Sequence, residues 1–280
     1  MVVSDLKDAS GDAQSYTDAE ENQLTEKPTP IPISPDRFGR LIERRDGLDF
    51  PYYTGRPVLI SGHQWWLVIA AVVVGFAALT TLPLTGPVLS FIPAILFVAI
   101  PLLVLRWVAP TGWTAIFRRV GGRDILVMIG FAALNVVVTF ALGAIVAAIT
   151  NATANPEAGV LADASTLERV VFYPRTAIQL LGEELLTILP FLALLYFLVS
   201  KAGWSRKHAV LLSWLVTAVA FGLVHLPTYD WNVLQCIVVI GGARVILTLA
   251  YIRTKNIWVS TGAHILNDWT LFSIPMLTAG

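Results

Sequence analysis

Three polar motifs interrupt the apolar stretches in the second half of the chain. The first is the pair Glu183-Glu184, the second is Phe221 with His225, and the third is His264 with Asp268. An ionisable group at membrane depth costs about 2.5–3.5 kcal/mol on insertion scales, so its presence there needs a partner or a function. Carboxylates and imidazoles are also the groups that proteins use to activate water. The motifs therefore predict an intramembrane active site.

The adjacent glutamates are expected to have different roles. Neighbouring residues on a helix point about 100° apart, so only one carboxylate can face a given reacting atom. A carboxylate in a dry pocket is a stronger base than one in water, which suits it to take a proton from water. The other glutamate is expected to make a helix–helix hydrogen bond or an ion pair with Arg175 or Arg244. The same structural role is the alternative to catalysis for either glutamate.

The two histidine motifs share a four-residue spacing, which places both members of each pair on one helix face. Asp268 could orient the His264 imidazole, or the pair could help to hold a metal. A lone membrane histidine such as His225 is more often a helix-packing hydrogen-bond donor, and His264 with Asp268 could be a local polar pair that stabilises the last helix. Two histidines and a carboxylate also match the ligands of a catalytic zinc site, although the chain has no HExxH motif. Zn²⁺ held by His225 and His264 is thus an open possibility.

The composition predicts an integral membrane protein. Hydrophobic residues make up 56% of the 280 residues and charged residues 14%, and the mean hydropathy is +0.70. The 19 basic residues balance the 19 acidic ones, so the charge gives no argument for a nucleic-acid partner. The single cysteine, Cys236, excludes an internal disulfide and a multi-thiolate metal site.

The positioning elements are expected to be about seven transmembrane helices in an all-α bundle in the cell membrane. A span needs roughly 20 apolar residues. The predicted spans cover residues 64–85, 88–108, 124–149, 171–199, 208–227, 232–252 and 257–277. The connections after the second, fourth and sixth spans are rich in Lys and Arg, and the others are not. By the positive-inside rule, this alternation predicts a cytoplasmic N-terminus and an external C-terminus.

Two regions are expected in the chain. Residues 1–60 are predicted to be a cytoplasmic N-terminal segment, disordered up to about Pro35 and then basic, aromatic and interfacial. Residues 61–280 are predicted to be the transmembrane domain, with the three motifs in a core at about residues 170–270. Membrane lipid is therefore one expected partner.

The order and spacing of the motifs resemble the CAAX-protease and bacteriocin-processing family of intramembrane proteases (CPBP, also called Abi), which includes the CAAX prenyl endopeptidase. That family shows EExxxR, then FxxxH, then HxxxN or HxxxD along its membrane helices. Glu183-Glu184 match the first motif, Phe221 and His225 the second, and His264 and Asp268 the third. The resemblance covers about residues 170–270.

One position departs from the family pattern, because Ile188 stands where the first motif usually has arginine. The second glutamate then needs another partner, for which Arg175 and Arg244 are the candidates, or it must be neutral. The departure favours one alternative function, a catalytically impaired membrane scaffold or immunity protein. A small transporter is the other alternative, but the polar groups do not recur in both halves of the chain.

The resemblance implies peptide hydrolysis without a covalent intermediate, with Glu183 and His225 activating water. His264 would stabilise the oxyanion or hold a metal, and Asp268 would orient His264. The substrate would be a peptide or a membrane protein. Prenylated CAAX proteins are less expected, because the short connections are typical of bacterial proteins. The sequence gives no oligomeric state.

Overall fold

The computed structural model describes residues 36–44 and 46–278, and the secondary structure of these residues is helical, without strands. The predicted all-α class is therefore confirmed. The helical elements are α2 (Gly62–Thr81), α3 (Phe91–Val108), η1 (Trp113–Ile116), α4 (Gly122–Ala147), α5 (Pro156–Asp163), α6 (Thr166–Tyr196), η2 (Phe197–Lys201), α7 (Arg206–Val224), η3 (Leu226–Tyr229), α8 (Val233–Gln235), η4 (Cys236–Ile240), α9 (Gly241–Thr254) and α10 (Ile257–Thr278).

Six helical stretches in the described part of the chain are long and apolar enough to cross a membrane. They are α2, α3, α4, α6 with η2, α7, and the continuous stretch from α8 through α9. The seventh predicted span forms helix α10 but is not one of the six. Its polar residues His264, Asn267 and Asp268 lower its hydropathy. Because His264 and Asn267 are buried among other helices, α10 does not need to be apolar throughout.

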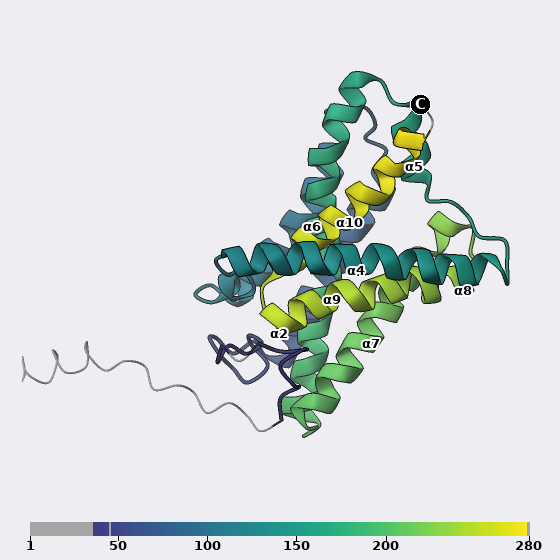
Figure 1. Ribbon diagram of the computed structural model, residues 1–280. Coiled ribbons are helices and arrows are strands. Elements are labelled where there is room, and N and C mark those ends of the chain that lie inside the picture. Colours follow the sequence, from purple (N-terminus) through teal and green to yellow (C-terminus); the bar gives the residue numbers. More distant parts are fainter. Residues whose placement is uncertain (1–35, 45, 279–280) are drawn as a thin grey trace, which may run out of the picture. The chain divides into compact units, whose positions relative to one another are not determined.

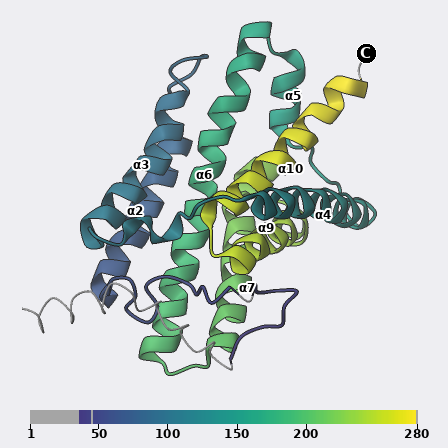
Figure 2. The same ribbon diagram turned by 60° about the vertical axis from the view of Figure 1, so that its left-hand side comes forward.

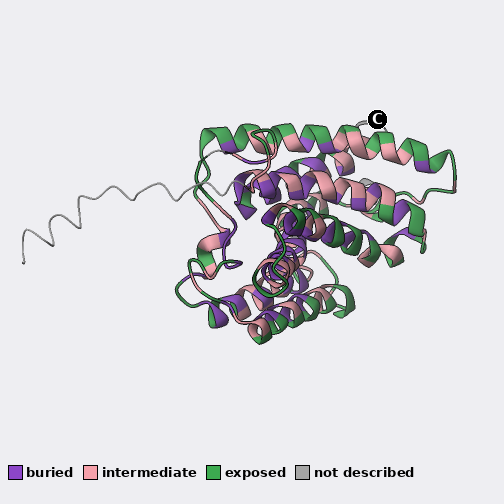
Figure 3. Cartoon of the chain, turned by 90° about the horizontal axis from the view of Figure 1, so that it is seen from below, coloured by how far each residue is buried: buried purple, intermediate pink, exposed green. Residues whose placement is uncertain are grey.

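Two sets of helices cross each other. Helices α2 and α3 pack together and against α6, and α6 also packs against α7. Helix α4 packs against α9 and α10, and it crosses α6 at a wide angle in both ribbon views (Figures 1 and 2). Exposed residues lie mainly on outward faces, and buried residues gather where helices meet (Figure 3). Helix α6 packs against both α7 and α10. The motifs on these three helices therefore come together although they lie at different points along them.

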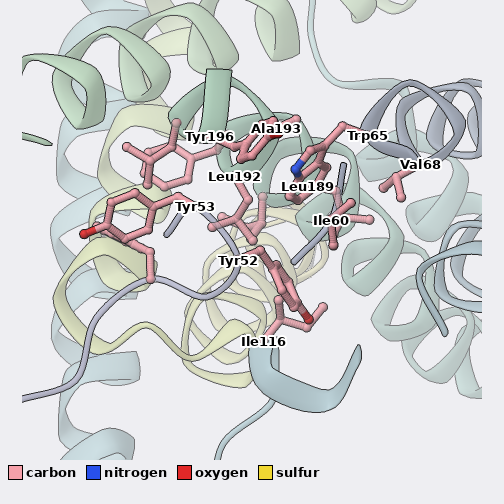
Figure 4. Packing of buried hydrophobic residues seen from close by; sticks show 14 of the residues in the cluster. Tyr52, Tyr53, Ile60, Trp65, Val68, Ile116, Leu189, Leu192, Ala193 and Tyr196 are labelled. Atoms are coloured by element: carbon pink, nitrogen blue, oxygen red, sulfur yellow. The ribbon is translucent and has the colours of Figure 1, made fainter. Parts of the chain in front are cut away.

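The chain before α2 packs against the helices. Phe50, Tyr52, Tyr53 and Ile60 are buried in the largest hydrophobic cluster. Figure 4 shows several of these side chains beside Trp65 of α2 and Leu189, Leu192 and Tyr196 of α6. The basic, aromatic part of the N-terminal segment is thus turns and irregular chain attached to the bundle. The stretch predicted to be disordered, up to residue 35, lies outside the described residues.

Ion pairs bind this segment to the basic connections. Glu43 accepts hydrogen bonds from Arg206 at 2.8 and 2.9 Å and from Lys255 Nζ at 2.7 Å. The backbone N–H of Arg118 donates to the Asn256 side chain at 3.1 Å. The connections after α3, α6 and α9 therefore lie at the same end of the bundle as residues 36–60. The structure contains no membrane, so the predicted cytoplasmic location of this end stays a prediction.

Candidate active site

Helix α6 holds both glutamates away from solvent. It begins with a capping box in which Ser165 and Glu168 each accept from the other's backbone N–H. Glycine at position 182 allows the Phe97 ring of α3 to pack directly on the helix, since an added Cβ would lie 2.3 Å from that ring. Glu183 is 8% exposed and Glu184 is fully buried. Neither carboxylate can therefore be explained as a solvated surface charge.

Arg244 of α9 is the partner of Glu184. The two side chains form a short ion pair and both are fully buried. The Arg244 guanidinium also lies over the Phe221 ring, 4.9 Å from its centroid. Of the two arginines expected as partners, Arg244 thus meets the glutamate, whereas Arg175 pairs with Glu157 at 3.2 Å. The charge missing at position 188 is supplied from another helix.

Ile188 itself is fully buried in the main hydrophobic cluster. The position that would carry arginine is therefore filled by apolar packing.

His264 links the two glutamates. Its Nδ1 lies 3.0 Å from Glu184 Oε1, and its Nε2 lies 3.8 Å from Glu183 Oε2 and 3.6 Å from Asp268 Oδ2. A carboxylate accepts hydrogen bonds, so Nδ1 donates its proton to Glu184 and Nε2 is the atom that faces Glu183. Glu184, within hydrogen-bond distance, orients the ring more directly than Asp268. This differs from the expectation that Asp268 has that task.

His225 caps the end of α7, where η3 begins. Its Nδ1 lies 2.7 Å from the Phe221 carbonyl, which can only accept, so Nδ1 carries the proton and Nε2 is free to accept one. The Phe221 ring lies 4.6 Å from the His225 ring and 6.4 Å from the His264 ring, measured between centroids. The aromatic residue of the second motif thus lies against both histidines.

The close packing of α7 determines where His225 lies. At Gly222 an added Cβ would be 2.4 Å from the Cys236 carbonyl oxygen, so the α7 backbone touches the π-helical turn η4. This wide turn continues directly into α9, which carries Arg244. The Gly241-Gly242 pair does not break the helix. One glycine contact therefore sets the relation between the second motif and the arginine.

A cavity of about 860 Å³ lies among these helices. Four of the five predicted site residues, Glu183, His225, His264 and Asp268, line it, and Glu184 lies behind them. The sequence analysis missed several other polar lining residues, namely Asn135, Thr139, Thr153, Thr176, Gln179, Tyr229, Gln235 and Asn267. Gln179 donates to Glu183 Oε1 at 3.0 Å. For Asn135 with Thr139 and for Thr176 with Gln179, the available signal was polar residues about one turn apart in an apolar run.

The expected zinc site, with His225 and His264 as ligands, stays a prediction. No group of three or more His, Cys, Asp and Glu side chains there is arranged to hold a metal ion. A catalytic zinc site uses three protein ligands and one open position. No step of the reaction proposed below is therefore routed through a metal.

The fold and the cavity define a multi-pass membrane protein with a buried glutamate–histidine site. Residues 168–270 match the family model described as type II CAAX prenyl endopeptidase Rce1-like. The resemblance inferred from the motifs is thus confirmed. The match includes the five predicted site residues and Arg244, but it covers less than half of the chain and leaves out α2, α3 and α4. No curated protein and no solved structure matches the chain.

Proposed function

We propose that this protein is an intramembrane endopeptidase in which Glu183 activates the water that attacks a peptide carbonyl. The observation that carries the proposal is the unequal environment of the two glutamates. Glu184 is paired with Arg244, whereas Glu183 lines the cavity and faces Nε2 of His264. One carboxylate is therefore held as a structural anion, and the other remains available to take a proton.

The proposed reaction is balanced by proton transfer through Glu183. Water loses a proton to Glu183 as its oxygen attacks the carbonyl carbon. The proton then passes to the amide nitrogen, and the C–N bond breaks to give a carboxylic acid and an amine. A His264 ring that already carries a proton on both nitrogens would donate from Nε2 to the oxyanion and keep that proton when the C–N bond breaks. Glu184 would hold that ring through Nδ1, and His225 would accept a hydrogen bond from the water at Nε2. Asp268, 3.6 Å from His264 Nε2, would favour the protonated ring.

The ion pair between Arg244 and Glu184 also bears on the alternatives. The scaffold alternative was based on the missing arginine at position 188, and a buried arginine from α9 supplies the same charge. This ion pair therefore supports the endopeptidase over the scaffold alternative. The family match favours an endopeptidase over a transporter.

For the substrate, we propose a membrane-associated peptide or protein. The family name refers to prenylated CAAX ends, so prenylated and unprenylated peptides both belong in the test.

The test compares wild type with Glu183→Gln in liposomes. The substrates are a quenched peptide library and peptides ending in Cys-aliphatic-aliphatic-Met, with and without a farnesyl group. We expect Glu183→Gln to lower cleavage by about 10²- to 10⁴-fold, the range for a positioned general base. The matched control is Glu157→Gln, because Glu157 also lines the cavity but is paired with Arg175 and more exposed. Equal activity of Glu183→Gln and wild type would overturn the proposal.

A further inference from the structure

Helix α4 brings two polar side chains to the same cavity from outside the family match. Asn135 and Thr139 lie one turn apart on α4 and both line the cavity. Only 11% of the membrane span of α4 is buried, so few of its positions face inward. Asn135 is on that inward face and is fully buried. The cavity thus has a polar wall on α4, in addition to the walls that carry the motifs.

The side chains of this wall have no hydrogen-bond partner within the described part of the chain. Both amide atoms of Asn135 and the hydroxyl of Thr139 are buried and unpaired. A buried polar group without a partner destabilises a fold, and an apolar residue of similar size would avoid that cost. Native structures leave few such groups, so each calls for an explanation. A bound ligand that supplies the missing partners is one.

The chemistry of these groups matches a peptide backbone. An asparagine amide presents N–H donors and a carbonyl acceptor side by side, and a peptide unit presents the complementary acceptor and donor. Side chains one helical turn apart are about 5–6 Å from each other. This is close to the roughly 6.6 Å between alternate residues of an extended chain. Backbone groups of two alternate residues could therefore be held by Asn135 and Thr139.

The cavity and a second polar wall, on α10, fit the same ligand. A volume of about 860 Å³ is within the range of sites that enclose a ligand. Asn267 of α10 also lines the cavity, and its Oδ1 is buried without a partner among the described residues. Its Nδ2 donates to Asp268 at 2.7 Å, beside the proposed reacting groups. An extended peptide would thus meet hydrogen-bonding groups on the walls formed by α4 and α10.

We propose that Asn135 and Thr139 form a subsite that binds the main chain of the substrate peptide and holds it extended beside Glu183. The subsite rests on the proposed function for its substrate class. In this assignment Asn135 is a positioning residue, because it contacts the substrate backbone away from the reacting atoms. Recognition of the backbone would make the subsite tolerant of different substrate side chains.

The decisive experiment combines Asn135→Leu with backbone esters in the substrate. Each ester analogue of the best-cleaved peptide replaces one non-scissile amide and so removes one N–H donor. We expect wild type to lose about tenfold in kcat/KM at one ester position, the effect of about one hydrogen bond. Asn135→Leu should lose about tenfold on the parent peptide, mainly through KM, and nothing further at that ester position. Thr139→Val should show the same behaviour at a different position.

A structural role would give another result. If the amide only packs within the bundle, Asn135→Leu will cleave the parent peptide as wild type does, or its ester penalties will equal those of wild type. Either result overturns the subsite. The thermal unfolding midpoint of Asn135→Leu should not fall, because two unpaired buried atoms are removed. A lower midpoint with unchanged ester penalties would count against the proposal.

Binding measurements separate the subsite from the proposed reaction. In the Glu183→Gln background, the probe is a fluorescein-labelled peptide ending in Cys-aliphatic-aliphatic-Met, with or without a farnesyl group. Adding Asn135→Leu should raise its Kd about tenfold. Binding that depends on Asn135 without any cleavage by wild type would overturn the hydrolase and leave the subsite standing. Cleavage that is the same with and without Asn135 would overturn the subsite and leave the hydrolase standing. If no probe binds, the subsite is overturned as well.

Discussion

Arg244 of α9 is ion-paired with Glu184 of α6, sixty residues earlier in the chain, and neither side chain is exposed to solvent. Two charges in the interior are tolerated only when each has its partner. The pair also holds a carboxylate against Nδ1 of His264. It therefore connects the stability of the bundle to the orientation of a proposed catalytic ring.

Removal of one member of this pair should be strongly destabilising. Arg244→Met leaves the Glu184 carboxylate buried without its cation, which typically costs about 3–5 kcal/mol. The double variant Arg244→Met with Glu184→Gln removes both charges and should recover much of the loss. The measurement is thermal or denaturant unfolding in detergent micelles. If the double variant is less stable than Arg244→Met alone, the unpaired Glu184 carboxylate is not the cause of the lost stability.

The contact of α7 with η4 should tolerate no side chain at Gly222. Gly222→Ala would place a methyl group against the Cys236 carbonyl, and overpacking of this kind costs about 1–3 kcal/mol. The backbone must then move close to His225, so cleavage should fall as well. The matched control is Gly130→Ala, because Gly130 lies within membrane helix α4 with nothing within 4 Å of an added Cβ. Its unfolding midpoint should be unchanged or higher.

Much of the site could be predicted from the sequence, because the motifs carry their chemistry in residue type and spacing. Glu183, His225, His264 and Asp268 do line one cavity. The choice between Arg175 and Arg244 could not be predicted, since it depends on how α9 crosses α6. Both arginines lie near the motif helices in sequence, and this did not decide between them.

Other features depended on tertiary packing in the same way. Asn135 lies in an apolar run that predicts an ordinary membrane span. Only its burial with unpaired amide atoms shows that it differs from the other residues of that span. The seventh span was predicted from its apolar residues. Helix α10 also contains polar residues, and it packs against α4, α6 and α9. Residues 36–60 were predicted to be interfacial because they are basic and aromatic. Their attachment to the bundle through buried Glu43 and Phe50 could not be predicted from that composition.

Glu43 should make the stability of the bundle depend on pH. Burial alone would raise the pKa of this carboxyl from its ordinary 4.5, but hydrogen bonds from Arg206 and the charge of Lys255 outweigh burial and lower the pKa to about 2. A carboxyl with a depressed pKa in the folded state stabilises the fold above the unfolded pKa. That contribution is lost as pH falls from about 4.5 to about 2.

The measurement is the difference in unfolding free energy between wild type and Glu43→Gln across this range. It should be largest near pH 7, where the shift corresponds to about 3 kcal/mol, and should shrink steadily below pH 4.5. A difference that stays constant down to pH 2.5 would show that the ionised carboxylate is not what stabilises this contact.

A zinc chelator should leave cleavage unchanged. The described residues gather no set of three metal ligands, and the proposed reaction uses Glu183 with the two histidines directly. The measurement is proteolysis in liposomes before and after incubation with 1,10-phenanthroline, with its non-chelating meta isomer as control. Loss of activity with the chelator alone, restored by added Zn²⁺, would instead favour the metal-dependent alternative with His225 and His264 as ligands.

The two ends of the bundle should face opposite sides of the membrane. Lys255, Arg206 and Arg118 lie at the end that also holds residues 36–60, and the positive-inside rule predicts that this end is cytoplasmic.

The native Cys236 is buried and is the only cysteine, so Cys236→Ala provides a background for single-cysteine labelling. Ala202→Cys reports the connection after α6, and Ala152→Cys reports the one after α4; both positions are exposed. A membrane-impermeant maleimide should label Ala152→Cys in intact cells and Ala202→Cys only after permeabilisation. The reverse pattern would invert the predicted topology, and labelling of both from outside would contradict the arrangement of the spans.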